Sequence, residues 1–187
     1  MEDSAHLLAS HDLEPQVEYR MFVVRDVLGD PLANNVPNGD WIVHSGPGGV
    51  VLGSGGNDFY PTVTLEVWSA VPPPDPGPWD AVDEADMDLP TGQLRVLAIL
   101  GRPAGPDLTV GSGRFRLRAH CRGRAEARAR IGVDLYYHGV EHWLLQLWPV
   151  GGPPEPPLAQ APPHPYSPEA LRARQIAGRS AAGTIIV

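Results

Sequence analysis

His138, Glu141 and His142 form the cluster in this sequence whose residue types could bind a metal ion. Two histidines four residues apart lie on one face of a helix, where both can coordinate the same zinc ion. The neighbouring residues Tyr136–Val140 are typical of a strand end and a turn. No helix is predicted here, so the spacing of four does not align the two histidines. We therefore expect neither a metal site nor a cofactor, and His138, Glu141 and His142 are the candidate ligands if a site forms.

The single cysteine is the second candidate for chemistry. Cys121 falls on the apolar side of an alternating run, where a buried thiol is a small, unreactive hydrophobic side chain. A nucleophilic cysteine needs a nearby base, and the adjacent His120 falls on the opposite side. One cysteine also cannot form an internal disulfide or a cysteine-rich zinc site. This pattern predicts a protein that is not an enzyme.

Two rows of opposite charge lie on separate strand-like runs. Glu84, Asp86 and Asp88 alternate along one run, and three arginines alternate with apolar residues in Arg114–Arg118. The carboxylates could bind calcium, but the glycine and final glutamate of an EF-hand loop are missing. The arginines could bind phosphate groups, but the net acidic charge of the chain disfavours a nucleic-acid partner. We expect the two rows to face each other as cross-strand ion pairs.

The complete absence of lysine excludes several classes of site. All fourteen basic residues are arginine. P-loop proteins need a lysine against the phosphates, protein kinases need one on a strand, and pyridoxal phosphate enzymes need one for the Schiff base. The chain therefore belongs to none of these classes.

Charge is distributed unevenly along the sequence. Residues 1–90 contain sixteen acidic and two basic residues, residues 91–187 contain six acidic and twelve basic residues, and the net charge is −8. An acidic surface repels nucleic acid and attracts cationic partners. The acidic first half therefore favours a protein partner, and a basic nuclease or toxin is the most concrete candidate.

The elements that must position these residues are strands. Short runs with a period of two, or of continuous apolar character, are separated by glycine- and proline-rich turns. About eight strands at this spacing predict an all-β fold, an antiparallel β-sandwich that is jelly-roll-like, with a proline-rich C-terminal arm and one short helix. The last strand is expected to be covered on both faces because it is nearly continuous in apolar residues. The predicted strands are Val17–Val27, Trp41–Ser45, Gly49–Leu52, Thr62–Ser69, Ala81–Leu89, Gln93–Leu100, Arg114–Cys121 and His142–Trp148.

Four segments are expected along the chain. They are an acidic leader (1–16), the β-sandwich domain (17–149), a proline-rich linker (150–168), and a short helix with a terminal β-forming segment (169–187). The terminal Ile185, Ile186 and Val187 are expected to pack on the edge of a sheet, either of this chain or of a second copy in a homo-oligomer. No apolar run reaches the roughly 18 residues of a membrane-spanning helix, and the N-terminus lacks a signal-peptide pattern. We expect a cytoplasmic protein with no membrane partner.

The order of strands and turns resembles a family of small bacterial proteins similar to competence protein J, the inhibitor of a DNA-entry nuclease. The resemblance covers residues 17–149 and rests on a strand around Phe22, on Trp41, on the turn Asp88–Gly92 and on the strand beginning Gly113–Arg118. Closer relatives in actinobacteria and proteobacteria share its Arg-Gly-Arg loop and its Leu-Gln-Leu-Trp-Pro ending. The resemblance implies a β-sandwich and an inhibitory function. Its matching positions lie in turns and the core, so no inhibitory residue is carried over.

Together these features predict a non-catalytic protein-binding module of the inhibitor or immunity type. The residues expected to bind the partner are Glu84, Asp86, Asp88, Ile185, Ile186 and Val187. One alternative is a small-ligand or carbohydrate-binding sandwich in which Trp41, Trp68, Trp79, Trp143 or Trp148 stacks against the ligand. Another alternative is a structural or assembly subunit that docks through its C-terminal arm.

Overall fold

The computed structural model describes residues 5–151, which form ten strands and one short helix. The strands are β1 (Leu7–Leu13), β2 (Met21–Asp26), β3 (Val43–Gly46), β4 (Gly49–Gly53), β5 (Tyr60–Trp68), β6 (Ala81–Leu89), β7 (Gln93–Ala98), β8 (Leu108–Thr109), β9 (Gly113–Arg122) and β10 (His138–Pro149), and the helix is α1 (Arg124–Ala129). The all-β fold with one short helix matches the fold class expected from the sequence.

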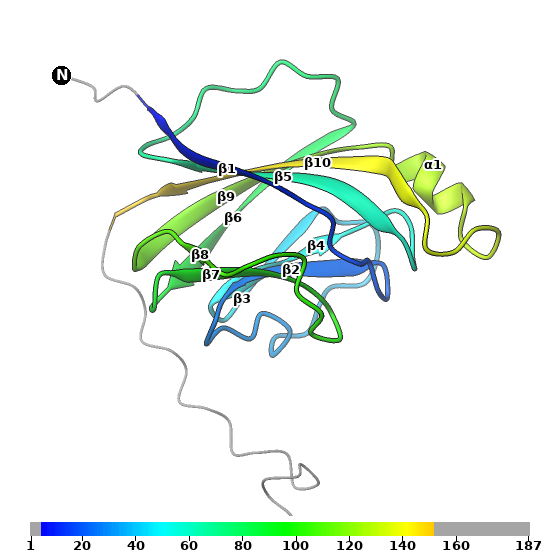
Figure 1. Cartoon of the computed structure of the whole chain (residues 1–187), viewed down its shortest axis with the longest axis horizontal. Helices are drawn as coiled ribbons and strands as arrows, with labels where there is room; N and C mark the ends of the chain where they lie inside the picture. The colour runs from blue at the N-terminus through cyan, green and yellow to red at the C-terminus, as the bar shows by residue number, and fades with distance from the viewer. Residues whose placement is uncertain (1–4, 152–187) are drawn as a thin grey trace, which may run out of the picture. The chain divides into compact units, whose positions relative to one another are not determined.

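The strands form two five-stranded sheets that pack face to face (Figure 1). The first sheet has the order β1-β5-β10-β9-β6, and the second has the order β3-β4-β2-β7-β8. Neighbouring strands are antiparallel with one exception, since β10 runs parallel to β5, with His142 opposite Thr62. The strand β10 is the centre of the first sheet.

The alternation of apolar residues determines which face of each strand is buried. In β5, Val63 and Leu65 point into the core, as the period of two predicts. In β10, Trp143 and Leu145 point into the same core, while Leu144 is buried on the other face. The expectation that this strand is covered on both faces is confirmed.

The connection between β5 and β6 covers the outer face of the first sheet, over which it arches in Figure 1. Arg118 donates a hydrogen bond to the Pro72 carbonyl oxygen (3.4 Å), and the ring of Trp79 packs against His120 at a centroid distance of 5.3 Å. His120 is 2% exposed as a result. The proline-rich crossing therefore shields this side of the sheet from water.

Two elements differ from the sequence expectation. The strand β1 lies inside residues 1–16, which we expected to be a loose leader, and it pairs with β5. The helix α1 forms in an arginine-rich stretch that we expected to be a loop. Alternating alanines give this stretch high helix propensity, and Ala127 is buried against the rest of the domain.

The expectations for the C-terminal part of the chain lie outside the described residues. They concern the proline-rich linker, the helix after Ser167, and the terminal Ile185, Ile186 and Val187. Within residues 5–151, no helix is long and apolar enough to cross a bilayer.

Candidate functional site

Four connections meet at one end of the sandwich, on the right in Figure 1. They are residues 14–20, 54–59, 99–107 and 130–137, and we call this region the loop end. Hydrogen bonds join them. The N–H of Asp58 donates to Val17 O (3.0 Å), that of Tyr136 donates to Asp58 O (2.6 Å), and that of Leu100 donates to Glu18 Oε2 (2.8 Å). These hydrogen bonds link the connections in a series, from 99–107 to 14–20, then to 54–59, and then to 130–137.

The buried carboxylate of Glu141 binds the loop end from the interior of the sandwich. It is 0% exposed and accepts hydrogen bonds from the Ser54 hydroxyl (3.1 Å), the Gly55 N–H (2.9 Å) and the Trp143 indole N–H (2.7 Å). Burial raises the pKa of Glu141 above its ordinary value, and these three hydrogen bonds partly oppose the rise. Glu141 thus ties residues 54–59 to the central strand.

A β-bulge in β10 places Glu141 in this position. The register of β10 against β5 shifts between His138 and His142. Within the bulge, Gly139 has φ 72° and Val140 has φ 70°. Positive φ is unfavourable for a β-branched residue, so the bulge is held by the contacts around it. The bulge leaves Glu141 and Trp143 on the same inward face of the strand.

Backbone strain is concentrated at the loop end. Among the described residues, the non-glycine residues with positive φ are Tyr19 (53°), Arg20 (62°), Asp58 (52°), Tyr136 (56°) and Val140 (70°). All five belong to the loop end or to the bulge that supports it. Such residues are unfavourable by about 1–3 kcal/mol each, and they persist where neighbouring contacts enforce them.

The turn at Tyr19 and Arg20 shows how the strain is held. Two consecutive positive φ values are typical of a type I′ turn, for which Asn-Gly is the favoured sequence. Here the Arg20 N–H donates to the Asn57 side-chain oxygen (2.9 Å), and the Arg20 carbonyl accepts from the Ser54 N–H (2.8 Å). Both side chains of the turn are exposed as a result.

Large apolar side chains are exposed on three connections of the loop end. Val133 is 76% exposed, Leu100 is 73% exposed and Tyr19 is 67% exposed, and Leu135 and Tyr136 are also exposed. We call these five residues the loop-end surface. Large exposed apolar side chains can contribute to a surface that another molecule covers.

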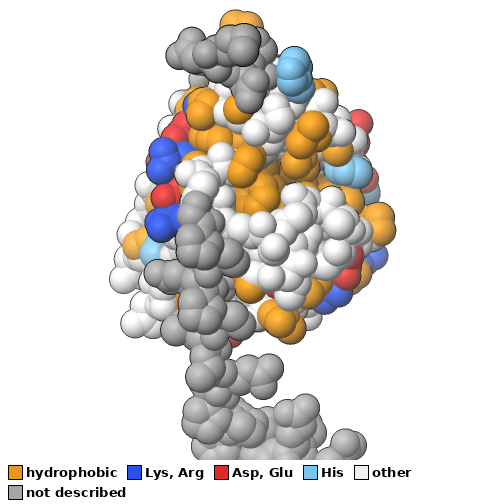
Figure 2. Space-filling view, turned by 90° about the vertical axis from the view of Figure 1, so that its left-hand side faces the viewer, with side chains coloured by type: hydrophobic (Ala, Val, Ile, Leu, Met, Phe, Trp, Pro, Cys, Tyr) orange, Lys and Arg blue, Asp and Glu red, His pale blue; other side chains and the backbone are white. Residues whose placement is uncertain are grey.

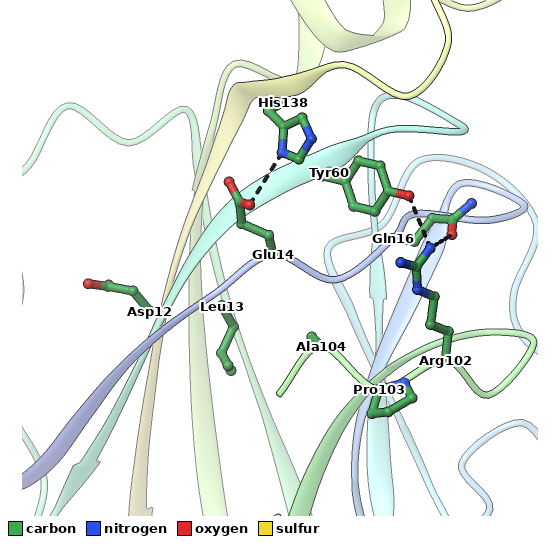
Figure 3. Close-up of a pocket in the computed structure, with 9 residues that line it drawn as sticks. All are labelled: Asp12, Leu13, Glu14, Gln16, Tyr60, Arg102, Pro103, Ala104 and His138. Atoms are coloured by element: carbon green, nitrogen blue, oxygen red, sulfur yellow. Dashed lines mark hydrogen bonds and ion pairs between the residues drawn. The ribbon is translucent and has the colours of Figure 1, made fainter. Parts of the chain in front are cut away.

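A polar pocket of about 530 Å³ opens beside the loop-end surface (Figure 3). We call it the Tyr60 pocket. The Tyr60 ring stacks on His138 at 4.7 Å, and the Tyr60 hydroxyl accepts a hydrogen bond from Arg102 (3.2 Å). The side chains of Asp12 and Glu14 line the other side, where Glu14 pairs with His138 at 3.3 Å. The pocket therefore has an acidic wall and a cationic wall.

A second hollow, of about 290 Å³, lies on the other side of the Tyr19–Arg20 turn. We call it the Trp41 pocket. Trp41 and Pro37 line it from the connection between β2 and β3, and Arg20 and Arg124 line it from the loop end and α1. The indole N–H of Trp41 donates to the Pro37 carbonyl (2.9 Å), which fixes the orientation of the ring.

The charged rows predicted from the sequence meet on the outer face of the first sheet. Arg116 pairs with Asp86 (2.6 Å), Arg118 pairs with Glu84 (2.6 Å), and Arg114 also reaches Asp86 (3.4 Å). The Arg116 guanidinium lowers the pKa of Asp86 below its ordinary range. The expectation of cross-strand ion pairs is confirmed for Glu84 and Asp86, whereas Asp88 lies opposite Arg114 and forms no ion pair with it. We call the array of paired residues the charge ladder.

The candidate metal ligands are not brought together. His138 lies at the Tyr60 pocket, Glu141 accepts hydrogen bonds from Ser54 and Gly55 of the β4–β5 connection, and the bulge separates the two. Within residues 5–151, no three side chains of His, Cys, Asp or Glu are placed to hold a metal ion. Cys121 is buried, and burial raises the pKa of its thiol well above the ordinary value.

The tryptophans occupy three kinds of environment. Trp143 and Trp148 are 2% exposed and fill the interior. Trp68 donates to Glu66 (2.8 Å), and Trp79 donates to Asp75 (2.7 Å), so their indole N–H groups are already used. Trp41 is the tryptophan that lines a described pocket.

The opposite end of the sandwich faces the viewer in Figure 2, where hydrophobic side chains gather around the centre of the view. The exposed apolar residues near the start of β1, in the β5–β6 connection and after β10 are Leu7, Leu8, Val71 and Val150. Unlike the loop end, this end has no non-glycine residue with positive φ among the described residues. It is a second apolar surface without the strained support.

The sequence reasoning missed the loop-end surface. The run from Ile131 to Tyr136 contains alternating apolar residues, a pattern that could equally have indicated a strand. The glycine at position 132 and the aspartate at 134 were the available signs of a loop. Nothing in the local sequence around Tyr19 and Arg20 indicates their positive φ values.

Comparison with known proteins identifies fold-level similarity alone. No protein-family model and no curated protein matches the sequence. Among solved structures, ComJ, the inhibitor of the DNA degrading activity of NucA from Bacillus subtilis, is similar with a TM-score of 0.47 and 8% identity, covering 79% of this chain and 100% of ComJ. The product of crocagin biosynthetic gene J is similar with a TM-score of 0.49 and 17% identity, covering 80% and 100%. ComJ belongs to the family that the strand layout resembles, and no residue role is transferred from either structure.

Proposed function

We propose that this domain is a non-catalytic protein-binding module that contacts its partner through the loop-end surface. The observation that carries the proposal is the exposure of Tyr19, Leu100, Val133, Leu135 and Tyr136 on three connections that hydrogen bonds link to neighbouring connections of the loop end. Exposing such side chains to water is unfavourable unless a partner covers them.

Pre-organisation supports binding rather than loose exposure. A partner that meets a rigid surface loses less conformational freedom on association than one that must order flexible loops. The hydrogen bonds from Ser54 and Gly55 to Glu141 keep residues 54–59 fixed, and those residues hold Tyr19, Arg20 and Tyr136 through backbone contacts. Tyrosine is also among the residues most often found at the energetic centre of interfaces.

Charge indicates the kind of partner. The chain carries −8, and Glu14, Glu18 and Asp58 lie at the loop end. A cationic partner is steered toward such a protein. The finer part of the proposal is therefore an inhibitor or immunity protein of a basic nuclease or toxin, acting in the cytoplasm.

The partner surface predicted from the sequence remains part of the proposal, but it is less favoured than the loop-end surface as the contact site. Glu84 and Asp86 already pair with arginines, so the charge ladder offers a mixed surface rather than an anionic one. The terminal Ile185, Ile186 and Val187 lie outside the described residues. The loop-end surface is favoured because its apolar side chains have no partner within the described domain that covers them.

The arrangement of reactive groups supports a role without catalysis. The Cys121 thiol faces the core while His120 lies on the outer face of the same strand, so the described residues do not pair this thiol with a base. Burial lowers the pKa of His120, which disfavours its protonated form.

The test compares two exposed valines. The products of the genes that flank this one are expressed and measured for binding to the full chain by isothermal titration calorimetry. Val133→Asp changes the loop-end surface, and Val82→Asp, at a side chain 52% exposed on β6, is the matched control beside the charge ladder. We expect Val133→Asp to weaken binding by at least tenfold and Val82→Asp to change it by less than threefold, since desolvated interface centres are worth roughly 2 kcal/mol or more.

Three results would contradict parts of this proposal. Loss of binding in Val82→Asp alone would place the partner on the charge ladder instead. Affinity that is equal at low and high salt would argue against a cationic partner. Hydrolysis of a substrate by the isolated chain would contradict the non-catalytic role.

The second apolar surface favours one alternative function. Leu7, Leu8 and Val71 are exposed at the end shown in Figure 2, which is the pattern expected for an assembly subunit. Light scattering on the full chain and on Leu8→Glu tests this alternative. A mass above that of one chain, lost in Leu8→Glu, would support assembly through this end.

A further inference from the structure

The Trp41 pocket has more cationic than anionic groups around it, although the protein as a whole is acidic. Arg124 and Arg128 both bind the carboxylate of Asp40, at 2.7 and 2.8 Å. The Arg128 hydrogen bond lowers the pKa of Asp40, so this carboxylate stays ionised. Arg20 lines the same pocket, which gives three guanidinium groups to one exposed carboxylate. Glu141, whose carboxylate is buried behind Ser54, leaves the balance positive even when it is ionised.

Arg20 is the cation of this group that is free to bind a ligand. Within the described residues its guanidinium forms no ion pair. Its backbone is fixed on both sides by Asn57 and Ser54 at φ 62°. An arginine held in an unfavourable conformation at the edge of a hollow is typical of a residue positioned for a ligand.

One wall of the pocket is apolar. Trp41, Met21 and Val36 line it, and they pack against a small apolar cluster on the outer face of the second sheet. The hydrogen bond from Trp41 to Pro37 orients the indole ring. A ligand that fills this hollow therefore meets a guanidinium on one side and an aromatic face on the other.

We propose that the Trp41 pocket binds a carboxylate attached to an apolar or aromatic group. A guanidinium pairs with a carboxylate through two parallel hydrogen bonds, and the apolar part of the ligand packs against Trp41. A doubly charged phosphate fits less well, because Asp40 lies in the same pocket and repels it more strongly. This ligand site adjoins the loop-end surface, because Tyr19 belongs to both, and binding of the ligand does not require a protein partner.

The first arm of the test uses two matched probes. N-acetylphenylalanine carries the carboxylate and an aromatic ring, and N-acetylphenylalaninamide has the same ring without the charge. Binding to the full chain is followed through the indole N–H signals in heteronuclear NMR, with Trp41→Phe used to assign the Trp41 signal. We expect a saturable shift of that signal with the carboxylate, at least fivefold weaker binding of the amide, and weakening at high salt.

The second arm uses two exposed arginines. Arg20→Gln removes the proposed partner of the carboxylate, and Arg102→Gln removes a comparable cation from the Tyr60 pocket. We expect Arg20→Gln to weaken the carboxylate about tenfold, as for loss of a charged hydrogen bond, and Arg102→Gln to change it by less than twofold.

Several outcomes would overturn the assignment. Equal binding of the acid and the amide would remove the role of the carboxylate. Equal effects of Arg20→Gln and Arg102→Gln would show nonspecific attraction to arginine. Tighter binding of phenyl phosphate than of the carboxylate would assign the pocket to phosphate. An unshifted Trp41 signal with all three probes would remove the site.

Discussion

Polar groups are arranged in opposite ways at the loop end and on the charge ladder. On the ladder, Arg116 and Arg118 pair with carboxylates across neighbouring strands, and the β5–β6 connection covers part of that face. At the loop end, the carboxylate of Glu141 is buried inside and bound to neutral donors, while apolar side chains are displayed outside. The charged side chains of the ladder pair with one another, whereas the exposed apolar side chains of the loop end are available to another molecule.

Paired charges and an isolated charge have different structural effects in the two regions. Alternating charges on two strands produce a surface that is locally neutral, so they contribute to solubility and register. The carboxylate of Glu141 constrains one whole connection, residues 54–59, because its hydrogen bonds from Ser54 and Gly55 would be lost if that loop moved. The isolated residue therefore has the larger structural effect.

The largest difference between the two regions is expected for Glu141→Ala. The change leaves the Ser54 hydroxyl, the Gly55 N–H and the Trp143 indole N–H without their acceptor. We expect a loss of about 3 kcal/mol in the free energy of unfolding, measured by urea denaturation. Glu84→Ala on the ladder is the control, with an expected loss of roughly 0–1 kcal/mol. Equal losses in the two variants would remove the distinction between the regions.

The pH dependence of Glu141 gives the next largest effect. Burial raises the pKa of Glu141 in the folded state, so the folded protein binds this proton more tightly than the unfolded chain. The stabilising contribution is full below the unfolded value of about 4.3 and is lost as pH rises through the folded value. We expect the stability of the wild type relative to Glu141→Gln to fall by up to about 1.4 kcal/mol per pH unit in that window. A difference that stays constant with pH would contradict a raised pKa.

Relief of strain at the turn should stabilise the protein by a smaller amount. Arg20→Gly replaces a residue with φ 62° by one that adopts positive φ freely. The gain from relieved strain exceeds the greater flexibility of glycine in the unfolded chain, so we expect an increase of about 0.5–1 kcal/mol in the free energy of unfolding. Thermal denaturation measures it. A decrease would show that the Arg20 side chain stabilises the loop end.

The smallest effect is expected on the ladder itself. Arg116→Ala removes the pair with Asp86, whose members are both partly exposed. We expect a loss of roughly 0.2–1 kcal/mol at low salt, which shrinks in 1 M NaCl because salt screens exposed charges. Urea denaturation at both salt concentrations checks this. A loss that persists at high salt would indicate that the arginine stem contributes by packing.

The strands with clear periodicity were predictable from the sequence. The alternation in β5, β6 and β9 identified both the strands and their inward faces, and the charged rows identified β6 and β9 as neighbours. The strand β1 was missed because it is an exposed edge strand. Leu7 and Leu8 are both exposed, so no alternation of polar and apolar residues marks a buried face. The parallel pairing of β5 and β10 depends on the path of the whole chain, which local patterns do not encode.

The candidate site was less predictable because it depends on contacts between distant segments. Glu141 was noticed as a possible metal ligand, but its partners at positions 54 and 55 are far away in the sequence. The φ values of Tyr19 and Arg20 contradict their intrinsic preference and are imposed by residues 54–57. Local propensity fails where tertiary contacts override it, and such places are often functional.

The parallel partnership of β5 and β10 also determines the order in which the domain can be completed. A growing chain emerges with its N-terminus first, and β5 and β9 are synthesised before the strand that lies between them. Until residues 138–149 are made, both neighbours have an unpaired edge that invites pairing with other chains. The first sheet closes when its central strand inserts, so this domain relies on late, long-range contacts that fold slowly and is exposed to misassembly during synthesis.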